Sequence, residues 1–241
     1  MQSSLYVSVS AQLALLRRIE AIANNVANAT TAGFRAEEVK FETLLSEVSL
    51  DPVAYASAGT PYLSRRGGEV VRTDNMFDVA VEGDAWLAIE APGGPAYTRD
   101  GRMQMAATGE LRTLTGYPVL DVGCAPILLD PNAGPPIIAR DGMITQNNNQ
   151  VGALGLFSID EKANLTRFEN SGVTSDLPVT PALDFAKVGV AQGYIERANV
   201  NTVMEISRLI AVSRAFEAVT AAINDSESSL QEAITTLGST S

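Results

Sequence analysis

The chain has 241 residues, 46% of them hydrophobic, with 17 basic and 28 acidic side chains and no histidine. This composition predicts a folded protein large enough for one substantial core and an accessory element. A net charge of −11 argues against a nucleic-acid partner, which needs clustered lysine and arginine, and the single cysteine, Cys124, excludes an internal disulfide.

The N-terminal segment has the pattern of an amphipathic helix from about Ser4 to Asn28. Its apolar residues recur in steps of four and three, interrupted only by Gln12, at Leu5, Val9, Leu16, Ile19, Ala23 and Val26. This spacing predicts a narrow stripe that packs against a partner helix, as in a coiled coil. We expect the helix to end in an Asn- and Thr-rich turn, in which Gly33 supplies a positive φ.

The start of the chain does not have the pattern of a targeting segment. Arg17 and Arg18 follow the apolar part rather than precede it, so we expect no cleaved secretory signal. Nor does any run reach the roughly 18 apolar residues of a membrane span. The sequence therefore predicts a chain without a membrane-spanning segment.

Residues 36–75 are expected to form an irregular connector. A short helix is predicted around Val39 to Val48, and the Pro-, Gly- and Ser-containing stretch after it has no clear period.

Between residues 76 and 196 the apolar period changes to two. Short β-rich runs alternate with turn signals such as Gly83-Asp84, Asp100-Gly101 and Asp141-Gly142. The pattern predicts an antiparallel β-domain of short strands and hairpins.

From about Asn199 the helical period returns and continues to Leu237. A second stripe, with Ser226 as its polar member, comprises Leu209, Val212, Phe216, Val219, Ile223, Leu230, Ala233 and Leu237. At 1.5 Å per residue this helix would be about 55 Å long, more than a domain of this size needs internally. We therefore predict an α+β fold in which residues 1–35 and 197–241 pair as a discontinuous coiled-coil domain and the β-domain is inserted between them.

Catalytic chemistry has little support in the sequence. The absence of histidine removes the commonest general base and metal ligand, and no phosphate-binding, nucleophile or paired-cysteine motif is present. The acidic residues Asp74, Asp78, Glu82 and Asp84 could be imagined as a cation site, but charged residues beside strands are usually solvated. No catalytic residue, metal site or cofactor is predicted.

Two Asn-rich segments carry a resemblance. Ala23-Asn24-Asn25, Ala27-Asn28, Thr31 and Gly33-Phe34 match the ANNxANxxTxGF signature at the N-terminus of the bacterial flagellar axial proteins, the rod and hook family. Asn199-Val200-Asn201 and Arg214-Ala215-Phe216-Glu217 match its C-terminal signatures, although Ala198 replaces the usual Ser. Taken alone, the same segments would be ordinary helix caps. Together they resemble that family over most of the chain.

The resemblance implies a structural subunit of the flagellar rod, most similar to proximal rod subunits, with the distal rod as the alternative. It further implies that the terminal helices polymerise with other rod subunits, and that the chain leaves through the flagellar type III export apparatus and lies in a rod that spans the periplasm. The residues it assigns to assembly are those of the two stripes and two signatures, with Arg214 and Glu217 included. A cytoplasmic helical adaptor would explain the stripes equally well, but not the paired Asn motifs.

Overall fold

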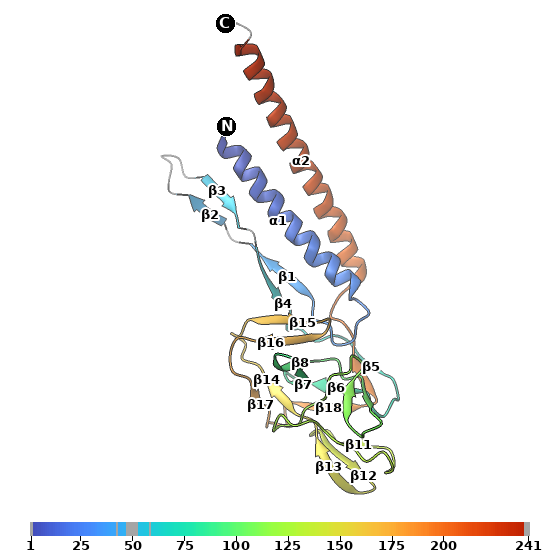
Figure 1. Ribbon diagram of the computed structural model, residues 1–241. Coiled ribbons are helices and arrows are strands. Elements are labelled where there is room, and N and C mark those ends of the chain that lie inside the picture. Colours follow the sequence, from blue (N-terminus) through green and yellow to red (C-terminus); the bar gives the residue numbers. More distant parts are fainter. Residues whose placement is uncertain (1, 42, 47–52, 58, 239–241) are drawn as a thin grey trace. The chain divides into compact units, whose positions relative to one another are not determined.

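The chain is an α+β protein whose sequence begins and ends with a long helix and is rich in β-strands between them (Figure 1). The computed structural model describes residues 2–41, 43–46, 53–57 and 59–238. Backbone contacts divide the chain into two units, one formed by residues 1–27, 37–62 and 201–241 and the other by residues 28–36 and 63–200. We call them the helical unit and the β-unit. The expected boundaries assigned residues 28–35 to the helices and 63–75 to a connector, whereas both segments lie in the β-unit.

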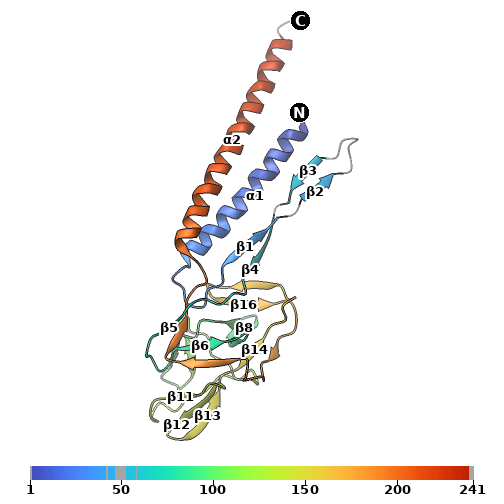
Figure 2. The ribbon, with the colours of Figure 1, turned by 180° about the vertical axis from the view of Figure 1, so that it is seen from behind.

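In the helical unit, α1 (Gln2–Ala27) and α2 (Thr202–Gly238) run side by side in opposite directions (Figures 1 and 2). Gln12 Nε2 donates a hydrogen bond to Thr220 Oγ1 at 3.0 Å across their contact. With 37 residues against 26, α2 continues beyond the start of α1. The two predicted terminal helices are therefore present and adjacent.

Two strand pairs complete the helical unit. β1 (Glu37–Lys40) pairs with β4 (Thr60–Leu63), and β2 (Thr43–Ser46) pairs antiparallel with β3 (Val53–Ala56), with Thr43 opposite Ala56. The short helix predicted at 39–48 is wrong for the described part of that range, and residues 42, 47 and 48 lie outside the described residues. Strand pairing and contact of β1 and β3 with α1 outweigh a weak helical pattern in a segment that contains Val, Phe and Thr.

The β-unit contains antiparallel strands, as the period-two pattern predicted. Its six-stranded sheet has the order β15-β16-β8-β7-β14-β17, with the bounds Leu165–Phe168, Gly172–Ser175, Gly94–Thr98, Trp86–Ala91, Leu156–Ser158 and Thr180–Pro181. A three-stranded sheet is formed by β11 (Ile137–Ile138), β12 (Met143–Gln146) and β13 (Asn149–Ala153). Three further pairs are β9 (Met103–Met105) with β10 (Leu111–Thr113), β6 (Val79–Glu82) with β18 (Gly189–Gln192), and β5 (Val70–Arg72) with β19 (Tyr194–Glu196).

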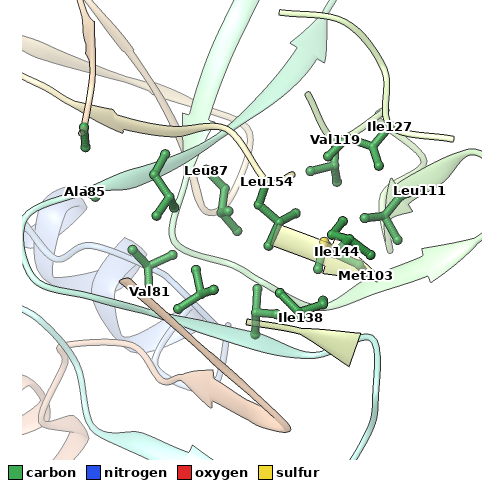
Figure 3. Close-up of a cluster of buried hydrophobic side chains, with 14 of the residues drawn as sticks. Val81, Ala85, Leu87, Met103, Leu111, Val119, Ile127, Ile138, Ile144 and Leu154 are labelled. Atoms are coloured by element: carbon green, nitrogen blue, oxygen red, sulfur yellow. The ribbon is translucent and has the colours of Figure 1, made fainter. Parts of the chain in front are cut away.

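The main core of the β-unit lies on one face of β7. Leu87 from that strand packs with Val81, Leu111, Ile144 and Leu154 (Figure 3). The neighbouring residues of β7, Trp86 and Ala88, belong to a second buried cluster, because successive side chains of a strand point to opposite faces. Since both faces are covered, the strand is almost continuously apolar.

Candidate assembly site

The turn after α1 requires glycine at position 33. Gly33 has φ +67, a left-handed conformation that residues with a Cβ rarely adopt. A Cβ at this position would lie 2.2 Å from the backbone nitrogen of Asp100, so backbone approach independently excludes a side chain. The Gly33 amide donates to the carbonyl oxygen of Glu196 at 2.8 Å. Before this turn, the Thr31 amide donates to the Asn28 carbonyl at 3.0 Å. Asn28 and Thr31 of the predicted N-terminal signature thus form a hydrogen-bonded turn in the β-unit, immediately before Gly33.

Phe34 and Asn199, one from each predicted signature, meet in the β-unit. The Phe34 side chain is fully buried, with the Arg167 guanidinium 4.2 Å from its ring centroid, and its carbonyl accepts a hydrogen bond from the Asn199 amide at 3.3 Å. The Asn199 side chain accepts from the Ala36 amide at 2.6 Å and donates to the Arg66 carbonyl at 2.8 Å. Asn199 therefore ties three chain segments together through backbone groups that would otherwise need other partners.

A buried charge cluster supports this turn. Glu196 Oε1 accepts from Arg35 Nη1 at 2.6 Å, and Glu196 Oε2 accepts from Arg99 Nε at 2.8 Å. The Gly68 amide adds a third hydrogen bond to Glu196 Oε1 at 2.7 Å. Each of the three charged side chains is at most 7% exposed. A carboxylate with this many donors is held firmly in a low-dielectric interior, because charge-assisted hydrogen bonds are the strong ones.

The two arginines of this cluster share one carboxylate. Burial lowers the pKa of Arg35, and the positive charge of Arg99 lowers it further, whereas Glu196 raises it. A guanidinium nevertheless stays protonated at neutral pH, so the cluster carries a net positive charge in the interior. Both arginines also lie near the Trp86 ring, with guanidinium carbons 5.4 and 5.9 Å from its centroid. Arg99 Nη1 additionally donates to the carbonyls of Gly83 and Ala85.

In the helical unit, the two consecutive asparagines of the N-terminal signature bind one residue of β1. Asn25, which is 3% exposed, donates to the Glu37 carbonyl at 2.9 Å and accepts from the Glu37 amide at 2.7 Å. Asn24 Nδ2 donates to the Glu37 carboxylate at 3.2 Å. Asn25 thus occupies both backbone groups of Glu37, as a neighbouring strand would.

Asn201 begins α2. Its side-chain oxygen accepts from the Met204 amide at 3.1 Å, and its carbonyl accepts from the Glu205 amide at 2.9 Å. This is N-cap geometry, which satisfies amides that have no partner inside the helix. Glu205 in the first turn pairs with Arg208 at 2.6 Å. Val200, just before the cap, is half-buried.

The predicted α2 stripe lies on the side of the helix that is partly covered. Val212 is buried, whereas Arg214 and Glu217 are exposed. The half-buried members of the stripe are Leu209, Phe216, Val219, Ile223 and Ser226. The side chains of Leu230, Ala233 and Leu237 lie outside the described part of the structure.

The predicted α1 stripe is divided between covered and exposed positions. Gln12, Ile19 and Val26 are half-buried, whereas Val9 and Leu16 are about 40% exposed. The side chain of Leu5 is outside the described part. The residues of α1 that are most buried, Ala14, Ala21, Ile22 and Asn25, lie on a neighbouring stripe. The strands β1 and β3 also contact α1, and Asn25 binds Glu37 of β1; periodicity alone did not reveal these neighbours.

Two searches of the described residues concern metal binding and membrane insertion. No three side chains of the metal-ligating types converge among them, and no helix they form is long and apolar enough to cross a bilayer. Three of the four acidic residues considered in the sequence have partners within the protein: Asp74 pairs with Arg72, Asp78 accepts from Asn75, and Glu82 pairs with Arg140.

Sequence reasoning missed the charge cluster. Arg35, Arg99 and Glu196 adjoin the recognised segments, but an isolated charged residue in a sequence is usually exposed. The only available signal was their position beside Phe34, Tyr97-Thr98 and Ile195, which is too weak to predict a buried triad.

Family models match three stretches of the chain: "Flagella basal body rod protein" at residues 5–35, "Flagellar hook protein FlgE/F/G D1 domain" at 80–146, and "Flagellar basal body rod FlgEFG protein C-terminal" at 191–236. The chain belongs to the flagellar basal-body rod proteins, as a structural subunit of that rod.

Named relatives match over nearly their full length. The chain is 50% identical to "Flagellar basal-body rod protein FlgF" of Mesorhizobium japonicum, covering 100% of both chains. It is 48% identical to the FlgF protein of Rhizobium meliloti, covering 99% of both. "Flagellar basal-body rod protein FlgG" of Bacillus subtilis is 27% identical, with 97% of this chain and 98% of that protein covered.

Proposed function

We propose that this chain occupies the proximal rod, as a FlgF-type subunit, and polymerises through α1 and α2 into the shaft that transmits motor torque. The observation that carries the proposal is the set of large apolar side chains that remain exposed on both helices. On α1 these are Tyr6, Val9, Leu13 and Leu16, and on α2 they are Val203, Met204, Ile206, Ile210 and Ile234. Exposed apolar faces of this kind mark interaction sites.

Polymerisation would give these faces their partners. Helices with apolar stripes gain most of their stability by packing, and stripes at 3.5-residue spacing pack as coiled coils. Ile234 is 69% exposed and lies near the C-terminal end of α2, where α2 continues beyond α1. A neighbouring subunit could cover that overhang. Contacts between different faces of successive copies propagate into an open rod.

The partners in this proposal are other copies and the adjoining proximal and distal rod subunits. To reach them the chain passes through the flagellar type III export apparatus and then lies in the part of the rod that spans the periplasm. The function requires no cofactor, no nucleic acid and no catalytic step.

The proximal position is tested by removing the distal rod subunit from the cell. Purified basal bodies should then still contain this chain, because a proximal subunit is added before a distal one. Loss of the chain from those basal bodies would place it in the distal rod instead. Finding the chain only in the cytoplasm of wild-type cells would support the adaptor alternative.

A further inference from the structure

The exposed face of α1 has a regular shape. Four exposed residues spaced by three, four and three positions form one stripe: Tyr6, Val9, Leu13 and Leu16. We call this set the α1 stripe; it is not the heptad stripe predicted from the sequence, although the two share Val9 and Leu16. They are 64%, 40%, 53% and 41% exposed, respectively. Four large apolar side chains on one line can pack as knobs into holes on the surface of a partner helix.

A flank of α2 offers holes of matching spacing. Ala211, Ala215, Ala218 and Ala222 are all exposed and are spaced by four, three and four residues; we call them the α2 alanine stripe. Alanines let a second helix approach closely and leave room between turns for larger side chains. At 1.5 Å per residue, the α1 stripe spans about 15 Å and the α2 alanine stripe about 17 Å.

The two stripes point to opposite sides of the helix pair. At about 100° per residue, the α1 stripe follows the α2-facing residues Gln12 and Ile19 by about one position, whereas the alanine stripe precedes Val212 and Phe216 by one position. Because α1 and α2 are antiparallel, these opposite shifts in sequence are rotations in the same sense about the axis of the pair, and they carry the two stripes to opposite sides of it. They cannot meet within one copy, but they can meet between successive copies.

We propose that the α1 stripe of each copy packs into the α2 alanine stripe of the next copy. This inference rests on the proposed function, since it names the contact by which copies of the chain join in the rod. Successive copies in a polar filament share one orientation, so α1 of one copy runs antiparallel to α2 of the next. In that orientation Tyr6 faces Ala222 and Leu13 faces Ala215. At the same register Val9 lies between Ala222 and Ala218, and Leu16 lies between Ala215 and Ala211.

This register differs from the one inside a copy. Within a copy Gln12 faces Thr220, whereas the stripe register puts Gln12 opposite a position about four residues earlier in α2. The difference is about 6 Å along the helix axis. Each copy is therefore displaced axially from its neighbour, and a repeated displacement gives an open helical array rather than a closed ring.

Charge at the end of the stripes agrees with the same pairing. Asp225 is exposed and continues the alanine stripe by three residues. In the proposed register it lies beside the first turn of the neighbouring α1, which contains no acidic residue of its own. The N-terminal end of a helix attracts negative charge, so Asp225 supplies the acidic group that the first turn of α1 lacks.

Cysteine cross-linking in basal bodies tests the contact. In a Cys124→Ser background, the chain carrying Leu13→Cys and Ala215→Cys should form a ladder of disulfide-linked multimers in oxidised basal bodies. Each single-cysteine variant should stay monomeric, because its partner position lacks a thiol. The matched control pairs Leu13→Cys with Asn224→Cys, an exposed position on the other flank of α2, and should give at least tenfold less multimer.

The outcomes separate this contact from the proposed function. If the double variant enters the rod and cells swim, but only monomer or cross-links to another protein appear, the stripe pairing is wrong while the function stands. If the wild-type chain is absent from basal bodies, the function itself fails.

A volume exchange gives an independent test. Leu13→Ala and Ala215→Leu should each reduce the number of flagellated cells several-fold, and the two changes together should restore it to near the wild-type level. Additive loss in the double variant would overturn the pairing, because the two positions would then not be in contact.

Discussion

Arg35 and Glu196, which are 161 positions apart in the chain, form a 2.6 Å ion pair in which both side chains are at least 98% buried. Arg35 follows the turn that leaves α1, and Glu196 ends β19 shortly before α2. The pair therefore joins the two ends of the sequence of the β-unit.

Replacing Glu196 by glutamine should destabilise the β-unit strongly. Arg35 and Arg99 would be left buried without a carboxylate, which costs about 3–5 kcal/mol. Urea unfolding followed through the fluorescence of Trp86, the single tryptophan, measures this loss. Glu69→Gln is the matched control, because its ion pair with Arg197 is exposed, and it should change stability by less than about 1 kcal/mol. Equal effects of the two changes would contradict a structural role for the triad.

Gly33→Ala should destabilise the β-unit by more than the positive φ of that position alone would. The left-handed conformation costs an alanine about 1–2 kcal/mol, and the collision with the backbone of Asp100 adds to that. Gly116→Ala isolates the conformational part, since Gly116 has φ +93 but open space where its Cβ would lie. The difference in the free energy of unfolding between the two variants checks this. If Gly33→Ala costs no more than Gly116→Ala, the turn can move away from Asp100.

Asn25→Leu should expose the backbone of Glu37 to exchange. An unsatisfied donor and acceptor cost about 1–3 kcal/mol each when buried, so the contact between α1 and β1 should open more often. Amide hydrogen exchange at Glu37 is the direct readout and should become at least tenfold faster. Asn24→Ala, which spares the backbone bonds of Glu37, should leave that amide nearly unchanged. Similar exchange in both variants would rule out the strand-like role of Asn25.

Val219→Asp combined with Ile223→Asp should block assembly. Both positions are half-buried on the α2 stripe, where an unpaired carboxylate costs several kcal/mol once a helix partner excludes water. The β-unit has its own core, so Trp86 fluorescence should still report a folded β-unit, while cells lose flagella. Asn224→Asp with Ser228→Asp has the same spacing on exposed positions and should preserve swimming. Rods that contain the first double variant would show that this stripe stays in water.

The sequence by itself determined the parts of this protein that depend on local pattern. Heptad spacing from Leu209 to Ile223 indicated α2 and its covered side, because side-chain direction in a helix follows from the period alone. Alternation and turn residues indicated the antiparallel strands, because side-chain direction in a strand also follows from the residue period. The motif from Asn24 to Phe34 supported the family, and Gly33 could be assigned a positive φ because turn chemistry is local.

Only the tertiary structure decided what each surface meets. The four described strands from β1 to β4 form because they pair with one another, and β1 and β3 contact α1. On α1 itself, Ala14 and Ala21 are more buried than Val9 and Leu16. The burial of Arg35 with Glu196 has the same origin. Its stability comes from two charges brought together across 161 positions, and no local pattern records an interaction over that separation.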